Sequence, residues 1–399
     1  MKVKEIHFVY FLIFLHAIAT LFTGFFKFSI FNPGPIRGVI VFSFVVYFIF
    51  NRFNFKDHFN FFIVLFLLYF GFLSFLSDSL YLYTGFFISL MMFPIGFYYF
   101  NSVDKLYRLS YIFCIILLTF IIYIFVSNIF KLGSSDYLED SFYFGEGRVN
   151  ITKTMIILLF SAPIYLYLET NKSRKRIALF IYLIGFFVCL IGIKRTVLVN
   201  LFLGPIIYFL LGPSSNKFFK YLIVFIVLSI PFFYYFSDVF IQRFEAREQV
   251  TSLSESRFEE EARYSEFFMV MDSFINGGLI HKFFGSYLFN DTEFFNTSRM
   301  LHIDYMVILN GAGIIGILFW FFHLFLLLGI KNSFSRLSLK SDFYKILNSV
   351  FWMCLTAQVL ISISGTIYSI DFRSFVLLLF GAILRNLKEM CLPVSYNKS

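Results

Sequence analysis

Residues 109–130 read LSYIFCIILLTFIIYIFVSNIF, an uninterrupted run without a charged side chain. A helix needs about 20 apolar residues to cross the hydrocarbon core of a bilayer. The run is therefore long enough for a transmembrane helix, and similar runs recur from one end of the sequence to the other. This pattern predicts an all-α, polytopic integral membrane protein.

The composition supports the same fold class. Of the 399 residues, 59% are apolar and 14% are charged, whereas soluble domains carry about 25% charged residues. Phe occurs 65 times, and the mean hydropathy is +0.80. These values exclude a soluble globular protein, a disordered protein and a nucleic-acid binder, despite the net charge of +9. An outer-membrane barrel is excluded because its strands alternate in polarity. We expect one transmembrane domain over residues 1–399.

Polar interruptions divide the sequence into about twelve predicted spans, or eleven if the last is discounted. Asp371 and Arg373 weaken that last span because they leave it a short apolar core. Two charges at Lys194 and Arg195 predict a tight hairpin between the seventh and eighth spans, directly after Gly192. The predicted spans are 8–26, 36–50, 59–77, 79–100, 109–130, 151–168, 177–193, 196–212, 218–236, 303–329, 346–365 and 369–386.

The basic residues predict the orientation. If the N-terminus is cytoplasmic, short inner segments hold more than twice as many Lys and Arg as short outer segments do. This bias follows the positive-inside rule, so we expect both termini in the cytoplasm. The net positive charge is then a property of the cytoplasmic face, where it suits anionic lipid headgroups.

The orientation leaves one large extracytoplasmic loop, residues 237–302. Ser252 and Glu255 fit a capping box, and the helix they start is expected to end at Asn276-Gly277-Gly278. Six residues form an apolar face at helical spacing, and we expect this face to pack on the membrane domain or to lie at its interface. They are Tyr264, Phe267, Phe268, Met271, Phe274 and Ile275.

Several charged residues have both a structural and a functional interpretation. Arg195 at the hairpin is either an interfacial anchor or an anion ligand, since Arg stays charged and binds phosphate in a bidentate way. Arg148, taken alone, fits an interfacial anchor. Arg263 fits an ion pair with Glu259 and Glu266 on its own helix.

His302 and Asp304 lie where the loop enters the tenth span. His302 is either an ordinary interfacial residue or a general base, because the pKa of His lies near neutrality. Gly311, Gly313 and Gly316 suit close helix packing. The sequence has no metal-binding motif, no cofactor motif and no nucleotide P-loop, and its four Cys predict no disulfide.

Residues 301–316, LHIDYMVILNGAGIIG, resemble the signature of the O-antigen polymerase/O-antigen ligase family, in which a His ends a large periplasmic loop. Ile193-Lys194-Arg195-Thr196 is similar to the hairpin motif of that family, and Ala262-Arg263-Tyr264 followed by Gly285 is similar to its loop motif. Two features depart from the family pattern: Ile303 follows the His, and only one Gly remains in the loop motif.

The resemblance implies a metal-independent glycosyltransferase of the bacterial inner membrane, without a cofactor. Arg195, with Arg148 or Arg263, would bind the pyrophosphate of a polyprenyl-linked sugar, and Asp304 would help bind the substrate. His302 would deprotonate the acceptor hydroxyl. The implied partners are polyprenyl-pyrophosphate-linked repeat units, membrane lipids and a chain-length regulator protein.

Three functions remain open at this point. We favour a repeat-unit polymerase, because the chain is strongly Phe- and Ile-rich and its signature around His302 is divergent. A ligase that transfers O-antigen to lipid A-core shares the same architecture. A lipid-linked oligosaccharide flippase is the alternative from another class, although transporters are commonly built from repeated halves, and no repeat is visible here.

Overall fold

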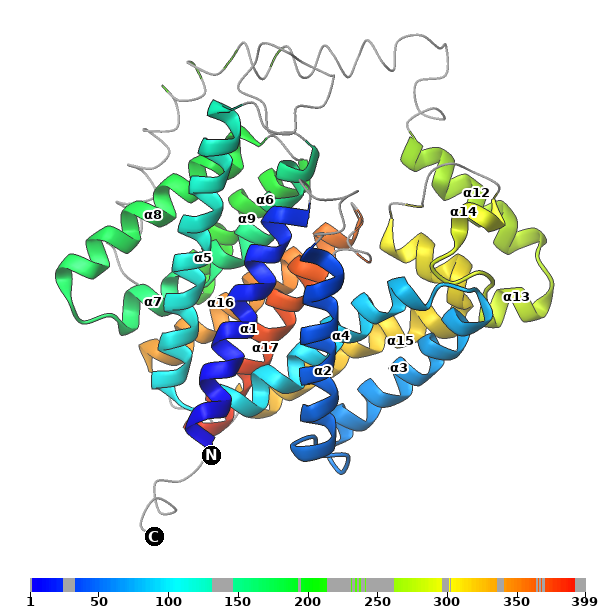
Figure 1. Ribbon diagram of the computed structural model, residues 1–399, viewed down its shortest axis with the longest axis horizontal. Helices are drawn as coiled ribbons and strands as arrows, with labels where there is room; N and C mark the ends of the chain where they lie inside the picture. Colours follow the sequence, from blue (N-terminus) through cyan, green and yellow to red (C-terminus); the bar gives the residue numbers. More distant parts are fainter. Residues whose placement is uncertain are drawn as a thin grey trace. The chain divides into compact units, whose positions relative to one another are not determined.

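The computed structural model describes residues 2–23, 33–130, 146–192, 195–213, 231, 234, 237, 241, 262–295, 301, 303–335, 341–363, 365, 367 and 370–391. Every regular element in these residues is a helix, as the sequence predicts (Figure 1). The helices are α1 (Lys2–Thr23), α2 (Pro33–Asn51), α3 (His58–Leu76), α4 (Leu80–Tyr99), α5 (Val103–Ile129), α6 (Glu146–Phe160), α7 (Ala162–Leu168), α8 (Lys172–Ile191), α9 (Arg195–Leu211), α12 (Ala262–Asn276), α13 (Leu279–Phe284), α14 (Asp291–Phe294), α15 (Asp304–Ser335), α16 (Asp342–Ile363) and α17 (Ile370–Cys391).

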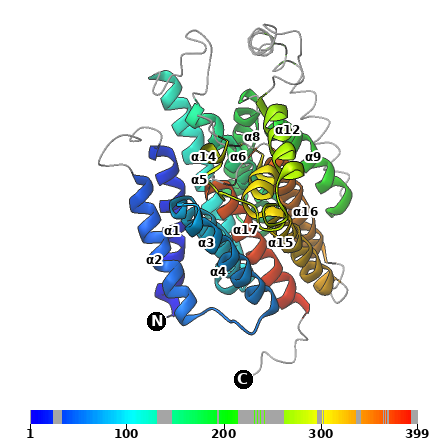
Figure 2. The ribbon, with the colours of Figure 1, turned by 90° about the vertical axis from the view of Figure 1, so that its right-hand side faces the viewer.

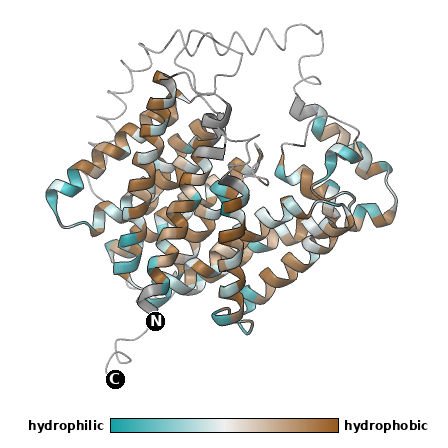
Figure 3. Cartoon of the chain, viewed as in Figure 1, coloured by the Kyte–Doolittle hydropathy of each residue, from teal (hydrophilic) through white to brown (hydrophobic). Residues whose placement is uncertain are grey.

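Six of the described helical segments are long and apolar enough to cross a membrane, and they indicate a membrane protein. They are His58–Leu76, Leu80–Tyr99, Val103–Ser127, Ile151–Leu168, Asp304–Ser333 and Asp342–Ile363. Figure 3 shows the apolar character of these long helices. The other predicted spans coincide with helices that are shorter or more charged, except 218–236, which lies outside the described residues apart from isolated positions.

The predicted span 151–168 is divided into two helices. α6 ends at Phe160, and α7 begins at Ala162, with Pro163 at its start. A proline has no amide hydrogen and clashes with the preceding turn. The Ser161 amide, between the two helices, donates to the carbonyls of Ile157 and Leu158 in the last turn of α6.

The described helices form two compact units. The first comprises Met1–Pro35, Val103–Glu255 and Leu339–Ala357. In it, α5 packs against α1, α6, α7 and α8, while α9 packs against α6 and α8. Gly192 ends α8, and α9 begins at Arg195 and packs against α8. Residues 193–194 of the predicted hairpin lie outside the described residues.

The second unit comprises Ile36–Ser102, Ser256–Ser338 and Gln358–Ser399. Its centre is the close packing of α4 against α17, and α3 and α15 pack beside them (Figures 1 and 2). Gly96 and Gly381 let the two backbones meet: a Cβ on Gly96 would lie 2.2 Å from the Leu378 carbonyl oxygen, and one on Gly381 would lie 2.2 Å from that of Phe93. Residues 372–384 of α17 are buried all around.

This burial explains why α17 looked weak as a lipid-facing span. A helix enclosed by protein can carry charges that would be costly in contact with lipid. Its Asp371 and Arg373 are therefore compatible with a helix at the centre of the unit.

α12 ends at Asn276, where the sequence predicted its end, and the predicted capping box lies outside the described residues. The predicted apolar face does not pack as a single surface. Among the described side chains of α12, Glu266 and Val270 are buried, whereas Phe267, Phe268 and Ile275 are exposed.

Candidate functional site

A buried ion pair joins the starts of α15 and α17. One Arg373 Nη atom lies 2.7 Å from Asp304 Oδ2, and the two side chains are 1% and 0% exposed. The other carboxylate oxygen accepts a hydrogen bond from the Ile367 amide at 2.7 Å. Buried charges are stable only when they are paired and hydrogen-bonded. Asp304 meets this requirement through contacts to two segments distant in sequence.

Arg373 also contacts an aromatic side chain from the far part of α15. Its guanidinium carbon lies 4.6 Å from the centroid of the Trp320 ring, a distance typical of a cation–π interaction. The rings of Tyr305 and Phe321 are stacked with their centroids 5.8 Å apart. Residues sixteen positions apart would be separated by about 24 Å in a straight helix. α15 therefore folds back on itself.

The reversal occurs at Gly313, whose φ is 62° and ψ is −162°. α15 thus consists of a first segment, 304–312, and a second segment, 314–335. A Cβ on Gly316 would lie 2.3 Å from that of Ala312 and 3.1 Å from Ile308, so the missing side chain lets the two segments meet. Close packing is found at all three glycines, because a Cβ on Gly311 would lie 2.6 Å from Leu288 and one on Gly313 would lie 2.4 Å from Phe283. The run predicted as the span 303–329 is helical and long enough to cross a membrane, but Gly313 divides it into two segments.

The end of the predicted loop packs onto this reversal. Gly285 has a φ of 72°, and a Cβ there would lie 2.3 Å from the Ala312 nitrogen. The Ser286 amide donates to the Asn310 carbonyl at 2.7 Å, and the Tyr69 hydroxyl donates to the Ala312 carbonyl at 2.8 Å. These bonds satisfy backbone carbonyls where the helix is interrupted, as a nonaqueous environment requires.

A histidine that the sequence analysis did not single out lies next to this region. The ring nitrogens of His281 lie 3.2 Å from Ser273 Oγ and 3.0 Å from Ser286 Oγ. The ring stacks on Phe294, with the centroids 5.6 Å apart. Burial lowers the pKa of His281 below its usual value, which favours the neutral imidazole.

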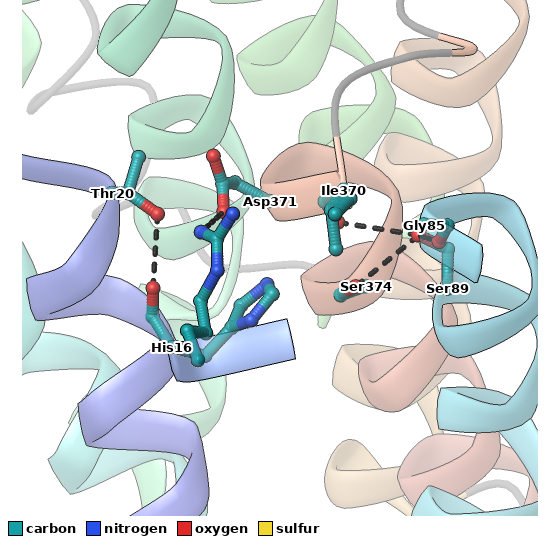
Figure 4. A network of polar contacts seen from close by, with 8 residues as sticks. His16, Thr20, Gly85, Ser89, Ile370, Asp371 and Ser374 are labelled. Carbon is teal, nitrogen blue, oxygen red and sulfur yellow. Dashed lines mark hydrogen bonds and ion pairs between the residues drawn. The ribbon is translucent and has the colours of Figure 1, made fainter. Parts of the chain in front are cut away.

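A second ion pair lies at the start of α17. Arg37 of α2 and Asp371 are 2.8 Å apart, and Figure 4 shows this contact together with the neighbouring hydroxyls. Ser89 of α4 donates to the Gly85 carbonyl at 2.9 Å and lies 3.3 Å from the Ser374 hydroxyl. Two acid–base pairs and a pair of hydroxyls thus surround the first turns of α17.

The predicted site residues are described to different degrees. Asp304 is buried and held by Arg373. Arg195, Arg148 and Arg263 lie at the starts of α9, α6 and α12, and their side chains are outside the described part of the structure. His302 is also outside it. The neighbouring Leu301 is described, and its amide donates to the Asp291 carboxylate.

Sequence analysis did not select Arg373, although it contained a usable signal. Arg373 is a charge within a predicted apolar span, and intramembrane charges commonly mark functional or paired sites. In the sequence, Arg373 indicates only that the last predicted span has a short apolar core. Its partner could not be identified, because the pairing depends on how α15 and α17 pack.

Within the described residues, no three His, Cys, Asp or Glu side chains come together as a metal site would require. The four cysteines are free, and three of them are buried. No known protein family matches the chain, and no curated protein matches its sequence.

Proposed function

We propose that the chain is a surface-polysaccharide (O-antigen) repeat-unit polymerase of the bacterial inner membrane. It transfers glycan from a polyprenyl-pyrophosphate carrier to an acceptor sugar hydroxyl at the outer face, and both its termini lie in the cytoplasm. The observation that carries this proposal is the anchoring around the His302 segment. Leu301 is hydrogen-bonded to Asp291 before it, and Asp304 to Arg373 and Ile367 after it.

Fixed neighbours on both sides suit a catalytic base, because catalytic groups act best when their supporting residues hold them in place. The predicted loop supports the same interpretation, since residues 283–286 pack on the helix that follows His302. A loop docked in this way is suited to covering a substrate at the membrane surface.

In the proposed reaction, His302 takes the proton of the acceptor hydroxyl as its oxygen attacks the anomeric carbon. The bond from that carbon to the pyrophosphate oxygen breaks, and the configuration is inverted. Arg195, with Arg148 or Arg263, stabilises the charge that develops on the departing pyrophosphate. Asp304 acts through Arg373 as a positioning residue, because both of its carboxylate oxygens are bonded within the protein.

Glycan length in a strain lacking the chromosomal gene tests this function. Loss of a polymerase leaves a single repeat unit on lipid A-core, whereas loss of a ligase leaves none. We expect the wild-type chain to restore a ladder of lengths. Arg195→Lys should lower polymerisation by about 10²–10³-fold, because an ammonium cannot make a bidentate contact. His302→Ala should abolish it.

Matched controls are the exposed residues Arg176 and His58. Arg176→Lys and His58→Ala should give normal ladders at equal amounts of inserted protein. Normal ladders for both Arg195→Lys and His302→Ala would overturn the assignment of these two residues.

One observation favours the transporter alternative. An interrupted helix beside a buried ion pair is a feature of many transporters, and α15 with Asp304 and Arg373 has both. Purified protein in vesicles with lipid-linked repeat units separates the two functions. New glycosidic linkages without lipid movement support the polymerase, and movement without new linkages supports a flippase.

A further inference from the structure

The helices α12 and α13 expose an unusual amount of apolar surface. Leu279 and Ile280 are 74% and 78% exposed. Five further large apolar side chains of α12 and α13 are exposed: Phe267, Phe268, Ile275, Phe283 and Phe284. A large exposed apolar surface marks contact with a protein, a ligand or a membrane.

The exposed residues of α13 share one side of the helix. At 100° per residue, Leu279, Ile280 and Phe283 fall within one arc. His281 lies on another side and contacts Ser273 and Ser286. The polar residue therefore faces the protein, and the apolar residues face outward.

Described contacts place α13 at one end of the second unit. The Phe283 carbonyl group lies against Gly313 at the reversal of α15. Beyond α13, the Ser79 hydroxyl donates to the Leu288 carbonyl, and the side-chain amide of Asn290 donates to the Ser77 carbonyl at 3.2 Å. Ser77 and Ser79 directly follow the end of α3, so the segment after α13 is fixed to that end.

α3 has an exposed apolar stripe that runs to the same end. Its members recur at spacings of three and four residues, which puts them on one side of the helix. They are Phe61, Leu65, Leu68, Phe72 and Phe75. Because α3 is long and apolar enough to cross a membrane, lipid is the natural partner of this stripe. The segment that follows α13 is bonded to this end of α3, and Figure 1 shows α13 near it. Figures 2 and 3 show the apolar α3 from the side and coloured by hydropathy.

We propose that α12 and α13 form an interfacial membrane anchor, in which Ile275, Leu279, Ile280 and Phe283 insert among lipid acyl chains at the boundary of the bilayer. Lys282, on the same short helix, extends to the phosphate headgroups. The inference rests on the exposed apolar side chains of α13 and on the attachment of the following segment to the end of α3, and it does not depend on the proposed enzymatic function.

Spin-label accessibility in lipid nanodiscs tests this anchor. The four native cysteines are replaced by alanine, and a nitroxide is attached at Ile280→Cys. Lys56→Cys, an exposed polar position in the connection between α2 and α3, is the control for water, because Asp272 shares the apolar face of α12. Leu68→Cys is the reference for lipid contact. Collisions with oxygen, which concentrates in lipid, are compared with collisions with a water-soluble nickel chelate.

The label at position 280 should resemble that at 68, with oxygen collisions several-fold more frequent than nickel collisions. The label at 56 should show the opposite ratio. If position 280 matches position 56, the helix is in water and the proposal fails. Protection from both reagents would mean that protein covers the surface, and this also overturns the proposal. Phe283→Cys is measured in the same way if the position 280 variant does not fold.

Discussion

The carboxylate of Asp304 and the guanidinium of Arg373 are buried in the second unit as opposite charges 2.7 Å apart. Removing one member of such a pair leaves an uncompensated charge in a nonpolar environment. The usual cost is about 3–5 kcal/mol, whereas removing both charges together costs less. The difference between the costs of the single and the double substitution distinguishes a pair that anchors the two helices from two residues that merely lie near each other.

We therefore expect Arg373→Met to lower the midpoint of thermal unfolding strongly, and Asp304→Asn to lower it as well. The double variant should recover part of the loss, which gives a positive coupling energy in a double-mutant cycle. Unfolding is followed in detergent, with exposed Arg176→Met as the control. If Arg373→Met unfolds at the same temperature as this control, the pair does not anchor α15 to α17.

Glu169, between α7 and α8 in the first unit, supports a prediction about pH. Its carboxylate accepts hydrogen bonds from the hydroxyls of Tyr107 at 2.7 Å and Tyr165 at 2.9 Å, and from the Asn171 amide at 2.8 Å. The bond from Tyr107 is the main reason that the pKa of Glu169 falls below the value of 4.5 usual for the unfolded chain, and burial partly opposes it.

A depressed carboxyl pKa stabilises the fold above the unfolded pKa, and this contribution is lost as the pH falls through the folded value. Glu169→Gln should therefore unfold at a lower temperature than the wild type at pH 7. The difference should shrink as the pH is lowered below about 4.5, because the wild-type carboxyl then becomes protonated. A difference that stays constant from pH 7 to pH 3 would contradict this account.

At the scale of elements, α15 shows where a sequence pattern is insufficient. An apolar run predicts a helix that can cross a membrane, and the run over 303–329 does form helix. Gly311, Gly313 and Gly316 are equivalent in the sequence, yet only Gly313 of these three has a positive φ. The reversal is stabilised by residues 283–286, which lie far from Gly313 in sequence, so hydropathy alone could not locate it.

Gly313 is consequently the most sensitive position in this element. Alanine there would need a backbone conformation that is nearly restricted to glycine, and its Cβ would lie 2.4 Å from the Phe283 carbonyl carbon. We expect Gly313→Ala to destabilise the protein by more than about 2 kcal/mol. Denaturant or thermal unfolding in detergent measures the change.

Gly329 provides a matched control in the same element. It is helical, and a Cβ there would meet no atom within 4 Å. Gly329→Ala should therefore stabilise the helix by about 0.5–1 kcal/mol, because alanine loses less backbone entropy on folding. Equal effects of the two substitutions would contradict the assignment of Gly313 as the turn.

At the scale of the whole molecule, the sequence predicted the helices more completely than the site. Apolar runs and their charged ends located the long described helices, because a chain in a bilayer must satisfy its backbone hydrogen bonds internally. They did not locate the short helices α13 and α14. The Asp304–Arg373 contact was not predicted, because it depends on the packing of helices that are distant in sequence. The side chains of Arg195, Arg148 and Arg263, and His302 itself, remain predictions.

The orientation of the molecule is the last prediction, and the proposed reaction depends on it. Ser173 lies exposed at the start of α8 among Lys172, Arg174 and Lys175, in the densest basic cluster of the predicted inner face. Ser254 lies in the predicted outer loop. In a cysteine-free chain, an impermeant maleimide applied to intact spheroplasts should label Ser254→Cys, and should label Ser173→Cys only after the membrane is permeabilised.

The positive-inside rule gives this result its physical basis, because basic residues flanking a span resist translocation. The reverse pattern would put residues 237–302 in the cytoplasm, away from an acceptor at the outer leaflet, and the polymerase proposal would fail with it. The lipid contact of Ile280 would survive that result, since an apolar surface at the end of α3 meets a bilayer boundary on either side. Maleimide labelling therefore tests on which side of the membrane the loop lies, and spin labelling tests independently whether α13 contacts lipid.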